Sequence, residues 1–387
     1  MNVLDNQEFA ILYVKSEAAN RKIILTFQKK TSLLETAKTI ISWYQKNKRD
    51  LPWRKTENPY YIWVSEIILQ QTRVDQGTAY YHRFIDKFPT VKKLAASKES
   101  DVLKLWQGLG YYSRARNMHH AAKEIVKDHK GTFPKNYADI RSLKGIGDYT
   151  AAAISSFAFH LKYPVVDGNV YRLLSRYLGI STPILSSAAK KEFTEIAFEL
   201  MAKNSPHEFN QAIMEFGAMQ CKPSGPDCNA CPLNDSCYAF GNNSVPDFPV
   251  KNKKTTIRKR YFYYLVVRDK QSLYLQQRKE KDIWHNLYEF PLIETSKKVQ
   301  ESKLLSSSEW KNIFNSGEAI VHKISPEKKH VLSHQVLHAK FIELSLRPGK
   351  FISPQNWKKV NKKNVKNYAV PRLIDRYLEE ELELYSA

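Results

Sequence analysis

The four cysteines of this chain constrain it more than any other feature. They are the only cysteines among 387 residues, and all of them lie between Cys221 and Cys237. Disulfide frameworks belong to small secreted domains, so one tight group in a large chain indicates a metal or cluster site. The spacing Cys221-x6-Cys228-x2-Cys231-x5-Cys237 favours a cubane iron–sulfur cluster, since cysteine thiolate is its usual ligand. A structural zinc ion stays an alternative, although zinc sites more often pair two short cysteine hooks and this loop has one.

The formal charge of +22 at pH 7 points to a polyanionic partner. Nucleic acid is the first candidate, because each neutralised phosphate releases counterions. A generally basic composition is the alternative explanation. No apolar run reaches the roughly 18 residues needed to span a bilayer, and the N-terminus has no secretory pattern. We therefore expect a monomeric, cytoplasmic protein of bacterial type that is associated with the nucleoid and not with a membrane.

Hydrophobic periodicity divides the chain into four predicted segments. Residues 1–30 are expected to be a poorly ordered N-terminal extension, with a helix as the other possibility. Residues 31–240 read as helix after helix; in residues 170–178, for example, apolar side chains recur at helical spacing. Residues 241–260 are rich in Asn, Pro and Lys and predict a linker. Residues 261–387 predict an α+β domain, with strands at 261–267, 272–276 and 339–344 and a last helix at 372–382.

Two carboxylates stand out from their surroundings. Glu66 interrupts the apolar run 62–69, so it is either on the surface of an amphipathic helix or buried. Burial raises the pKa of a carboxyl group, which would make Glu66 a usable general acid. Asp167 directly precedes a predicted helix, where an N-cap is the simplest role, and the hydrogen bonds of an N-cap predict an ionised group. One protonated and one charged carboxylate would suit glycosidic cleavage, in which an acid protonates the leaving group and an anion faces the cationic sugar.

The segment from residue 143 to residue 151 predicts a helical hairpin. Gly145 and Gly147 separate the end of one predicted helix from the start of the next and allow a tight turn. Backbone N–H groups exposed at such a turn, at a helix N-terminus, suit a DNA phosphate. An ordinary helix–turn–helix corner is the alternative, because two glycines alone are weak evidence.

At these motifs the chain resembles the helix–hairpin–helix, iron–sulfur DNA glycosylases and, among them, the MutY-type adenine glycosylases. The resemblance covers residues 33–371, and its motifs occur in family order: 51–54, 59–60, 63–72, 108–112, the glycine hairpin, 166–170 and the four cysteines. It implies a multidomain fold, with an all-helical glycosylase domain and a C-terminal Nudix-like α+β domain. It also implies a [4Fe–4S] cluster on the four cysteines. The implied partner is double-stranded DNA with adenine opposite 8-oxoguanine or guanine.

The resemblance also implies roles for single residues. Glu66 would protonate adenine at N7 and then assist the attacking water. Asp167 would stabilise the oxocarbenium ion or trap the sugar covalently, and Tyr149 and Asn169 would support this chemistry. The adenine pocket is matched by Arg49, Trp53, Arg54 and Gln211. The side that holds 8-oxoguanine is matched by Gln71, Thr72, Leu109 and Tyr111, with Tyr111 as the stacking wedge.

The identity of residue 149 bears on strand cleavage. The related endonuclease III lyases carry a lysine nucleophile just after the hairpin, where this chain has Tyr149. A tyrosine cannot form the Schiff base that strand cleavage needs, so a monofunctional glycosylase is predicted.

The C-terminal segment 284–291 matches the tryptophan-to-proline segment of the family's Nudix-like domain. The span after Pro291 lacks the acidic box that would bind Mg²⁺, so this domain is predicted to recognise 8-oxoguanine and not to hydrolyse a nucleotide. Ser333 and His334 stand where the family places hydrogen-bonding residues, and Leu332 replaces a phenylalanine.

At the hairpin, Lys144 replaces a proline and Asp148 replaces a basic or neutral residue. The Asp148 carboxylate would weaken phosphate binding, and Lys144 would compensate.

Three other functions compete with this interpretation. A mismatch glycosylase for thymine or uracil would share the fold and the cluster, but Glu66 and the Ser333–His334 pair argue against it. A DNA-binding protein without activity is disfavoured because both Glu66 and Asp167 are present. A nucleotide-pool hydrolase is disfavoured by the missing acidic box.

Overall fold

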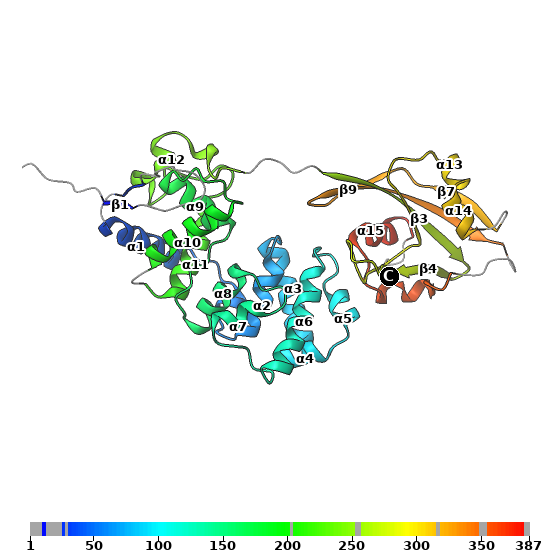
Figure 1. Cartoon of the computed structure of the whole chain (residues 1–387), viewed down its shortest axis with the longest axis horizontal. Helices are drawn as coiled ribbons and strands as arrows, with labels where there is room; N and C mark the ends of the chain where they lie inside the picture. Colours follow the sequence, from blue (N-terminus) through cyan, green and yellow to red (C-terminus); the bar gives the residue numbers. More distant parts are fainter. Residues whose placement is uncertain are drawn as a thin grey trace, which may run out of the picture. The chain divides into compact units, whose positions relative to one another are not determined.

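The computed structural model describes residues 10–12, 25–27, 30–201, 204–251, 257–314, 318–347 and 354–382. Its chain divides into two compact units, which are drawn in Figure 1. The first unit contains residues 1–86 and 124–253, and the second unit contains residues 87–123 and 254–387. The passage from one unit to the other lies inside the predicted linker 241–260. The helical segment 87–123, however, groups with the C-terminal domain and not with the rest of the helices.

The first unit is helical apart from its N-terminal strands. Helices α1 (Lys30–Asn47), α9 (Gly168–Leu178), α10 (Ser187–Met201) and α11 (Pro206–Met219) surround one core. The apolar face predicted for residues 170–178 is confirmed, because these side chains of α9 pack into this core. Short helical segments complete the region: η1 (Pro52–Arg54), η2 (Asn234–Ser236), α12 (Tyr238–Gly241) and η3 (Val245–Asp247).

A second group of helices in the first unit forms the predicted hairpin and its support. Helix α2 (Pro59–Leu69) is followed by α3 (Val74–Lys87), and it is buried on nearly every side and packs against α8 (Asp148–Phe159). The turn 143–147 joins α7 (Tyr137–Ser142) to α8, and Gly145 in this turn has a φ of 80°. Glycine adopts this left-handed conformation without steric cost, so the predicted glycine turn is confirmed.

The N-terminal extension differs from the expectation of a helix in the part that the structure describes. Strand β1 (Ala10–Leu12) pairs with β2 (Leu25–Phe27) in an antiparallel arrangement. The prediction of poor order for residues 1–30 otherwise falls outside the described residues.

The second unit combines helices α4 (Val91–Ala96), α5 (Glu99–Leu105) and most of α6 (Ser113–Asp128) with a mixed β-sheet. The sheet order is β10-β4-β3-β9-β7, and the short strands β5, β6 and β8 pair with β4, β3 and β9. Strands β3 and β9 are parallel, with Arg258 opposite Gln335. The strand bounds are β3 (Arg258–Asp269), β4 (Ser272–Gln277), β5 (Tyr288–Glu289), β6 (Leu292–Thr295), β7 (Ala319–Ile324), β8 (Lys328–Val331), β9 (Gln335–Leu346) and β10 (Trp357–Asn361).

Both faces of this sheet are covered, as the alternation of side chains along β3 requires. Phe262 and Tyr264 pack into a core with α15 (Arg372–Glu380), and Val365 joins this core from η4 (Lys362–Asn367). Tyr263 and Leu265 pack on the other face with α13 (Glu301–Leu305) and α14 (Ser308–Ile313). The three predicted strands and the last helix are therefore confirmed. No helix among the described residues is both long and apolar enough to cross a membrane.

Side-chain hydrogen bonds join the segment 87–123 to the C-terminal domain within the second unit. The Gln107 amide donates to Asp375 Oδ1 on α15 at 2.7 Å. The Asn286 amide donates to Glu99 Oε1 on α5 at 2.7 Å. These contacts attach α5 and the residues that follow it to the C-terminal domain, although the sequence assigned them to the helical domain.

Candidate active site

Glu66 and Tyr149 meet where α2 packs against α8. Glu66 is only 7% exposed, and the Tyr149 hydroxyl donates a hydrogen bond to its Oε2 atom at 2.7 Å. Burial raises the pKa of Glu66 to about 7; the charge of Asp167 acts in the same direction, and the Tyr149 hydrogen bond and Arg54 oppose it. The predicted burial and upward pKa shift are thus confirmed. Burial also raises the pKa of Tyr149 far above its usual value, so this phenol stays a donor.

Asp167 is the N-cap of α9, as the sequence predicts. Its Oδ1 accepts the backbone N–H groups of Asn169 and Val170, each at 2.9 Å, and its Oδ2 accepts the Asn169 amide at 2.6 Å. The ionised state predicted for Asp167 stays a prediction. Burial raises the pKa of Asp167 above its usual value. The hydrogen bonds from Asn169 and Val170 lower it, but by less than burial raises it. The N-cap is visible in the sequence, but the protein packed around the carboxylate is not.

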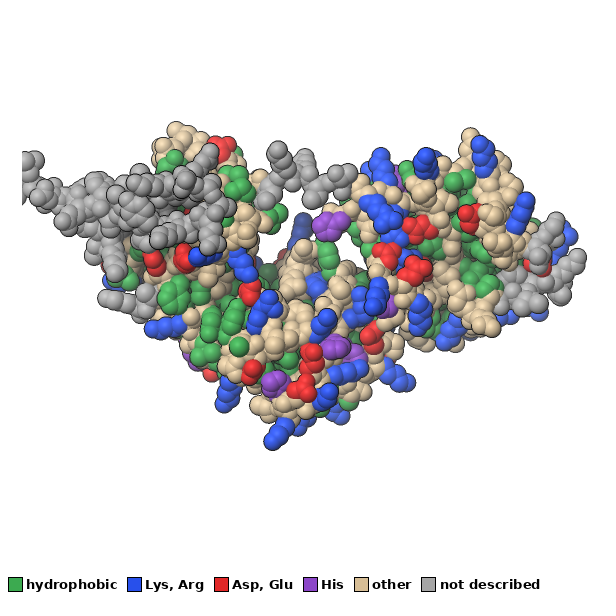
Figure 2. Space-filling view, viewed as in Figure 1, with side chains coloured by type: hydrophobic (Ala, Val, Ile, Leu, Met, Phe, Trp, Pro, Cys, Tyr) green, Lys and Arg blue, Asp and Glu red, His purple; other side chains and the backbone are tan. Residues whose placement is uncertain are grey.

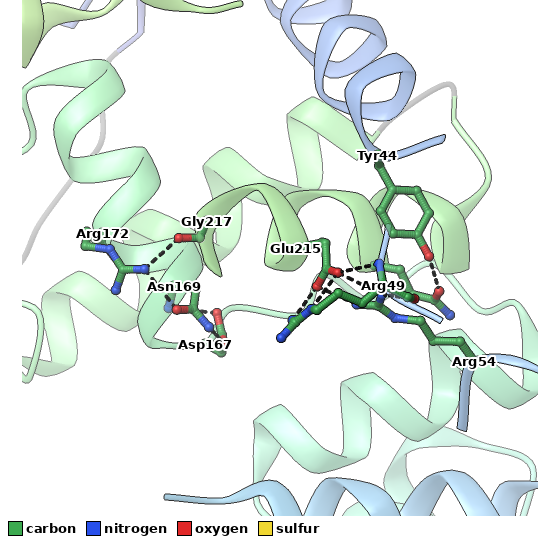
Figure 3. A network of polar contacts seen from close by, with 9 residues as sticks. Tyr44, Arg49, Arg54, Asp167, Asn169, Arg172, Glu215 and Gly217 are labelled. Carbon is green, nitrogen blue, oxygen red and sulfur yellow. Dashed lines mark hydrogen bonds and ion pairs between the residues drawn. The ribbon is translucent and has the colours of Figure 1, made fainter. Parts of the chain in front are cut away.

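Arg172 connects the Asp167 site to the cysteine loop, as Figure 3 shows in part. Its Nη2 atom donates to Asn169 Oδ1 at 2.9 Å and to the Gly217 carbonyl at 2.6 Å, and its Nε donates to the Cys221 carbonyl at 2.8 Å. A Cβ at Gly217 would lie 2.7 Å from the Asn169 carbonyl oxygen, so α11 approaches α9 too closely for a side chain. Arg172 was not predicted from the sequence, although its position three residues after Asn169 on one helix was a usable signal.

Of the four residues predicted for the adenine pocket, Gln211 lies on α11, and Arg49 and Arg54 contact Glu215 of this helix, as Figure 3 shows. Arg49 donates to Glu215 through Nε at 2.8 Å and Nη2 at 2.5 Å, and Arg54 donates through Nη1 at 3.1 Å and Nη2 at 2.8 Å. Burial alone would raise the pKa of Glu215, but the hydrogen bonds from both arginines lower it to about 2. Gln211, one turn earlier on α11, accepts the Tyr44 hydroxyl at 2.6 Å.

Glu215 is the pocket residue that the sequence analysis missed. It is 1% exposed and carries the charge that both arginines neutralise. Its spacing of four residues from Gln211 places the two on one helix face, which was the available signal. The fourth predicted residue, Trp53, lies in η1, is 9% exposed and packs edge-on against Tyr81 with ring centroids 5.4 Å apart.

The hairpin turn carries an acidic residue that two cations neutralise. Asp148 pairs with Lys190 and with Arg141 Nε, and the hydrogen bonds from Lys190 and Arg141 lower its pKa to about 2. The side chain of Lys144 is exposed, and its backbone N–H donates to Glu124 Oε2 at 2.9 Å. Neutralisation of Asp148 thus comes from Arg141 and Lys190, neither of which the sequence analysis identified. On the face in Figure 2, Lys and Arg side chains are spread over both units.

The residues predicted to hold 8-oxoguanine belong to both units. Gln71 and Thr72 follow α2 in the first unit, and Gln71 has a φ of 56°. The second unit carries the other four: Leu109, Tyr111, Ser333 and His334. Leu109 is 8% exposed and Tyr111 is 47% exposed.

Within the second unit, the structure brings together two of these residues from distant parts of the chain. The hydroxyls of Tyr111 and Ser333 form a hydrogen bond. Ser333 and His334 are exposed in the turn between β8 and β9. Leu332, which stands in place of a phenylalanine, packs partly against the core under α15.

The four cysteines line one pocket, whose other walls include Leu173, Arg176, Tyr177 and Phe216. Arg176 donates to Cys221 Sγ at 3.5 Å and to the Lys222 carbonyl at 2.7 Å. In the part of the chain that the structure describes, no three His, Cys, Asp or Glu side chains are grouped so that they could hold a single metal ion. Four cysteine side chains that face one pocket are a donor set that suits an iron–sulfur cluster, whose usual ligand is the cysteine thiolate.

Two family models match the chain. Residues 64–199 match the HhH-GPD superfamily base excision DNA repair proteins, and residues 263–380 match the NUDIX domain. The adenine DNA glycosylase of Buchnera aphidicola subsp. Acyrthosiphon pisum is 36% identical over 343 residues, which cover 88% of this chain and 95% of that protein. The adenine DNA glycosylase of Homo sapiens is 40% identical over 210 residues, 52% of this chain and 38% of that protein.

Two solved structures are similar to the helical part. A thermostable thymine-DNA glycosylase has a TM-score of 0.50 and 28% identity, and the match covers 55% of this chain and 98% of that chain. Endonuclease III in a non-covalent complex with DNA has a TM-score of 0.50 and 20% identity over 56% of this chain and 99% of that chain, which supports the fold alone. Both domain models match, and the Buchnera relative is matched over nearly its whole length. The chain therefore belongs to the adenine DNA glycosylase family and is a DNA N-glycosylase of base excision repair.

Proposed function

We propose that this protein removes adenine mispaired with 8-oxoguanine or guanine from double-stranded DNA, and that it leaves an abasic site. The observation that carries this proposal is the buried Glu66 carboxyl, which has a pKa of about 7, a hydrogen bond from Tyr149 and electrostatic coupling to Asp167. A carboxylic acid that is protonated near neutral pH beside a second carboxylate is the arrangement that glycosidic cleavage uses.

Each carboxyl group has one task in the proposed reaction. After adenine is flipped out of the helix, Glu66 donates its proton to N7 of the base. The bond between C1′ and N9 then breaks, and its electron pair leaves with the base. Asp167 faces the positive charge that develops on the sugar, and Asn169 and Arg172 hold its orientation through the contacts described above. Water forms the new bond to C1′ and returns a proton to Glu66.

We also propose that the enzyme is monofunctional. Strand cleavage by a lyase begins with an amine that attacks C1′, and the position after the hairpin holds a phenol whose proton is firmly retained. Borohydride reduction of a reaction with substrate DNA tests this point. Little covalent trapping is expected, and efficient trapping would contradict the proposal.

We propose a [4Fe–4S] cluster at Cys221, Cys228, Cys231 and Cys237, supported by the pocket that the four side chains line. When bound, the cluster would crosslink this loop and add to folding stability. The contacts of Arg172 and Arg176 with the loop backbone would then hold α9 against a fixed segment. Metal analysis of anaerobically purified protein should give about four irons per chain; stoichiometric zinc without iron would contradict the assignment.

The base opposite adenine is proposed to contact Gln71, Thr72, Leu109, Tyr111, Ser333 and His334. Backbone N–H groups at Gly145 and Gly147 are proposed to bind a DNA phosphate, supported by the turn conformation of Gly145. The protein is also proposed to act as a monomer, and the proposed DNA partner places it at the bacterial nucleoid.

One experiment separates this function from its nearest competitor. Thymine removal is the competing activity, because a thymine-DNA glycosylase shares the helical fold at 28% identity. That structure matches 55% of this chain, whereas the adenine glycosylase of Buchnera matches 88% of it. Purified protein should be incubated with duplexes that contain adenine opposite 8-oxoguanine, adenine opposite guanine, or thymine opposite guanine. Adenine release, fastest opposite 8-oxoguanine, is expected; thymine release without adenine release would overturn the proposal.

A further inference from the structure

A buried arginine in the second unit has no part in the excision chemistry. Arg260, on β3, is 5% exposed, and its guanidinium carbon lies 4.9 Å from the centroid of the Phe262 ring. Its Nε and Nη2 atoms donate to the two carboxylate oxygens of Glu294, each at 2.7 Å, and its Nη1 pairs with Asp282 Oδ2 at 2.7 Å. The side chains of Asp282 and Glu294 are 31% and 32% exposed, so Arg260 is the buried member of a partly exposed ion-pair network. Its remaining contacts show what this network supports.

A further contact of Arg260 leads to the turn 332–335, which joins β8 to β9. The Nη1 atom donates to Gln335 Oε1 at 3.3 Å. Gln335 closes this turn, because its carbonyl accepts the N–H of Leu332 at 2.8 Å. The backbone N–H of Arg258, two residues before Arg260, donates to the His334 carbonyl at 3.2 Å. Strand β3 therefore supports the turn at two points, one through its backbone and one through the Arg260 side chain.

Asp282 connects the same arginine to the loop 282–286. The His285 carbonyl in this loop accepts Arg116 Nη1, on α6, at 2.9 Å. The next residue, Asn286, donates to Glu99 on α5 at 2.7 Å. The loop is thus attached to both helices that flank the segment of Leu109 and Tyr111.

These contacts close a ring within the second unit. Arg260 contacts both the turn 332–335 and the loop 282–286, and this loop contacts α5 and α6. Tyr111 lies between α5 and α6 in the sequence, and its hydroxyl forms a hydrogen bond with Ser333 in the turn. We propose that Arg260 is a positioning residue for recognition of the base opposite adenine, because it fixes the turn 332–335 relative to Tyr111. This inference rests on the proposed contact of Ser333 and His334 with 8-oxoguanine.

Two variants and one control test the inference. Arg260→Lys keeps the positive charge but loses the two-pronged guanidinium contacts, and Gln335→Leu removes only the link to the turn. Arg268→Lys is the matched control, because Arg268 lies at the other end of β3 and pairs with Glu343. The readouts are single-turnover excision of adenine opposite 8-oxoguanine and opposite guanine at subsaturating and saturating enzyme, and the melting temperature of each variant.

The expected result is a loss of discrimination without a loss of chemistry. Arg260→Lys and Gln335→Leu should each reduce the preference for 8-oxoguanine over guanine about fivefold, the factor that corresponds to one hydrogen bond. The saturating excision rate opposite guanine should stay at the wild-type value, and Arg268→Lys should keep the full preference. If Arg260→Lys does not fold, Gln335→Leu alone decides the outcome.

Three results would overturn the inference and can be told apart. If the wild type prefers 8-oxoguanine and a folded Gln335→Leu protein keeps the same preference, the positioning role of Arg260 is refuted and the proposed function stands. An equal loss of preference in Arg268→Lys would show that any weakening of the sheet has the same effect. A wild-type protein that excises adenine without preference would refute the proposed recognition function, and with it the inference that rests on it.

Discussion

The two units place their proposed functional groups in opposite environments. In the first unit, Glu66 and Glu215 are 7% and 1% exposed, and burial and nearby charges move their pKa values to about 7 and about 2. In the second unit, Tyr111 is 47% exposed, Ser333 and His334 are also exposed, and the buried Arg260 contacts Gln335 in the turn that carries them. An acid must be shielded from water to hold its proton at neutral pH, whereas residues that test a base in DNA must reach the surface.

This difference predicts that substitutions in the two units differ in the size and the kind of their effects. In the first unit, a change at a buried carboxylate alters a protonation state or leaves a charge without a partner, so the effect on rate or stability is large. In the second unit, a change at an exposed contact removes one hydrogen bond, so the effect is small and falls on discrimination between opposite bases. The predictions below test this division in order of expected size.

Asp167→Asn should have the largest effect. A neutral amide cannot offset the cation that develops on the sugar, so single-turnover adenine excision should fall about 10³-fold. Asparagine is as good an N-cap as aspartate, so α9 and the melting temperature should be preserved. Near-wild-type excision by this variant would mean that another group stabilises the sugar cation, and it would contradict the proposed difference between the two units.

Glu215→Gln should mainly change stability. Arg49 and Arg54 would lose the charge that neutralises them, and removal of one partner of a buried pair costs about 3–5 kcal/mol in the free energy of unfolding. In the wild type, the lowered pKa of Glu215 means that this stability is present above the ordinary value of 4.5 and is lost as the pH falls towards about 2. Urea unfolding at several pH values measures both effects. The exposed Glu195 on α10 is the control, and Glu195→Gln should change the free energy by less than about 0.5 kcal/mol.

Ser333→Ala should have the smallest effect. The loss of one hydrogen bond predicts about a fivefold lower preference for 8-oxoguanine over guanine opposite adenine. The saturating excision rate should not change, because no group of the first unit is altered. Competition between the two duplexes in one reaction measures the ratio directly, with Ser302→Ala on α13 as the control. A loss of excision rate on both duplexes would contradict the division between the units.

Local patterns were sufficient to predict the elements of the fold and several site residues. The aromatic and β-branched residues in 261–267 predict a strand, and the helical spacing in 170–178 predicts the buried face of α9. The position of Asp167 before a helix predicts its N-cap, and the apolar run around Glu66 predicts its burial as one of two readings. Each of these features depends on neighbours in the chain, which a sequence displays.

The features that escaped prediction depend on contacts between distant segments. Glu215 is fixed by Arg49 and Arg54, which lie more than 160 positions earlier in the chain. The pKa of Asp167 is raised by protein packed around it, although the local hydrogen bonds lower it. The grouping of 87–123 with the C-terminal domain depends on contacts such as Gln107 with Asp375. Helical spacing places Glu215 on the same face as Gln211, but periodicity does not identify the distant partners in any of these cases.

Glu66→Gln tests the central claim most directly, because that claim makes Glu66 the general acid. Wild-type single-turnover excision should be high below pH 7 and should fall above it, since the raised pKa of about 7 means that the proton is lost there. Glutamine has no proton to donate, so excision by Glu66→Gln should fall about 10²- to 10⁴-fold, while its affinity for DNA with adenine opposite 8-oxoguanine stays close to that of the wild type. Excision by this variant at a near-wild-type rate, with an unchanged pH profile, would contradict the account.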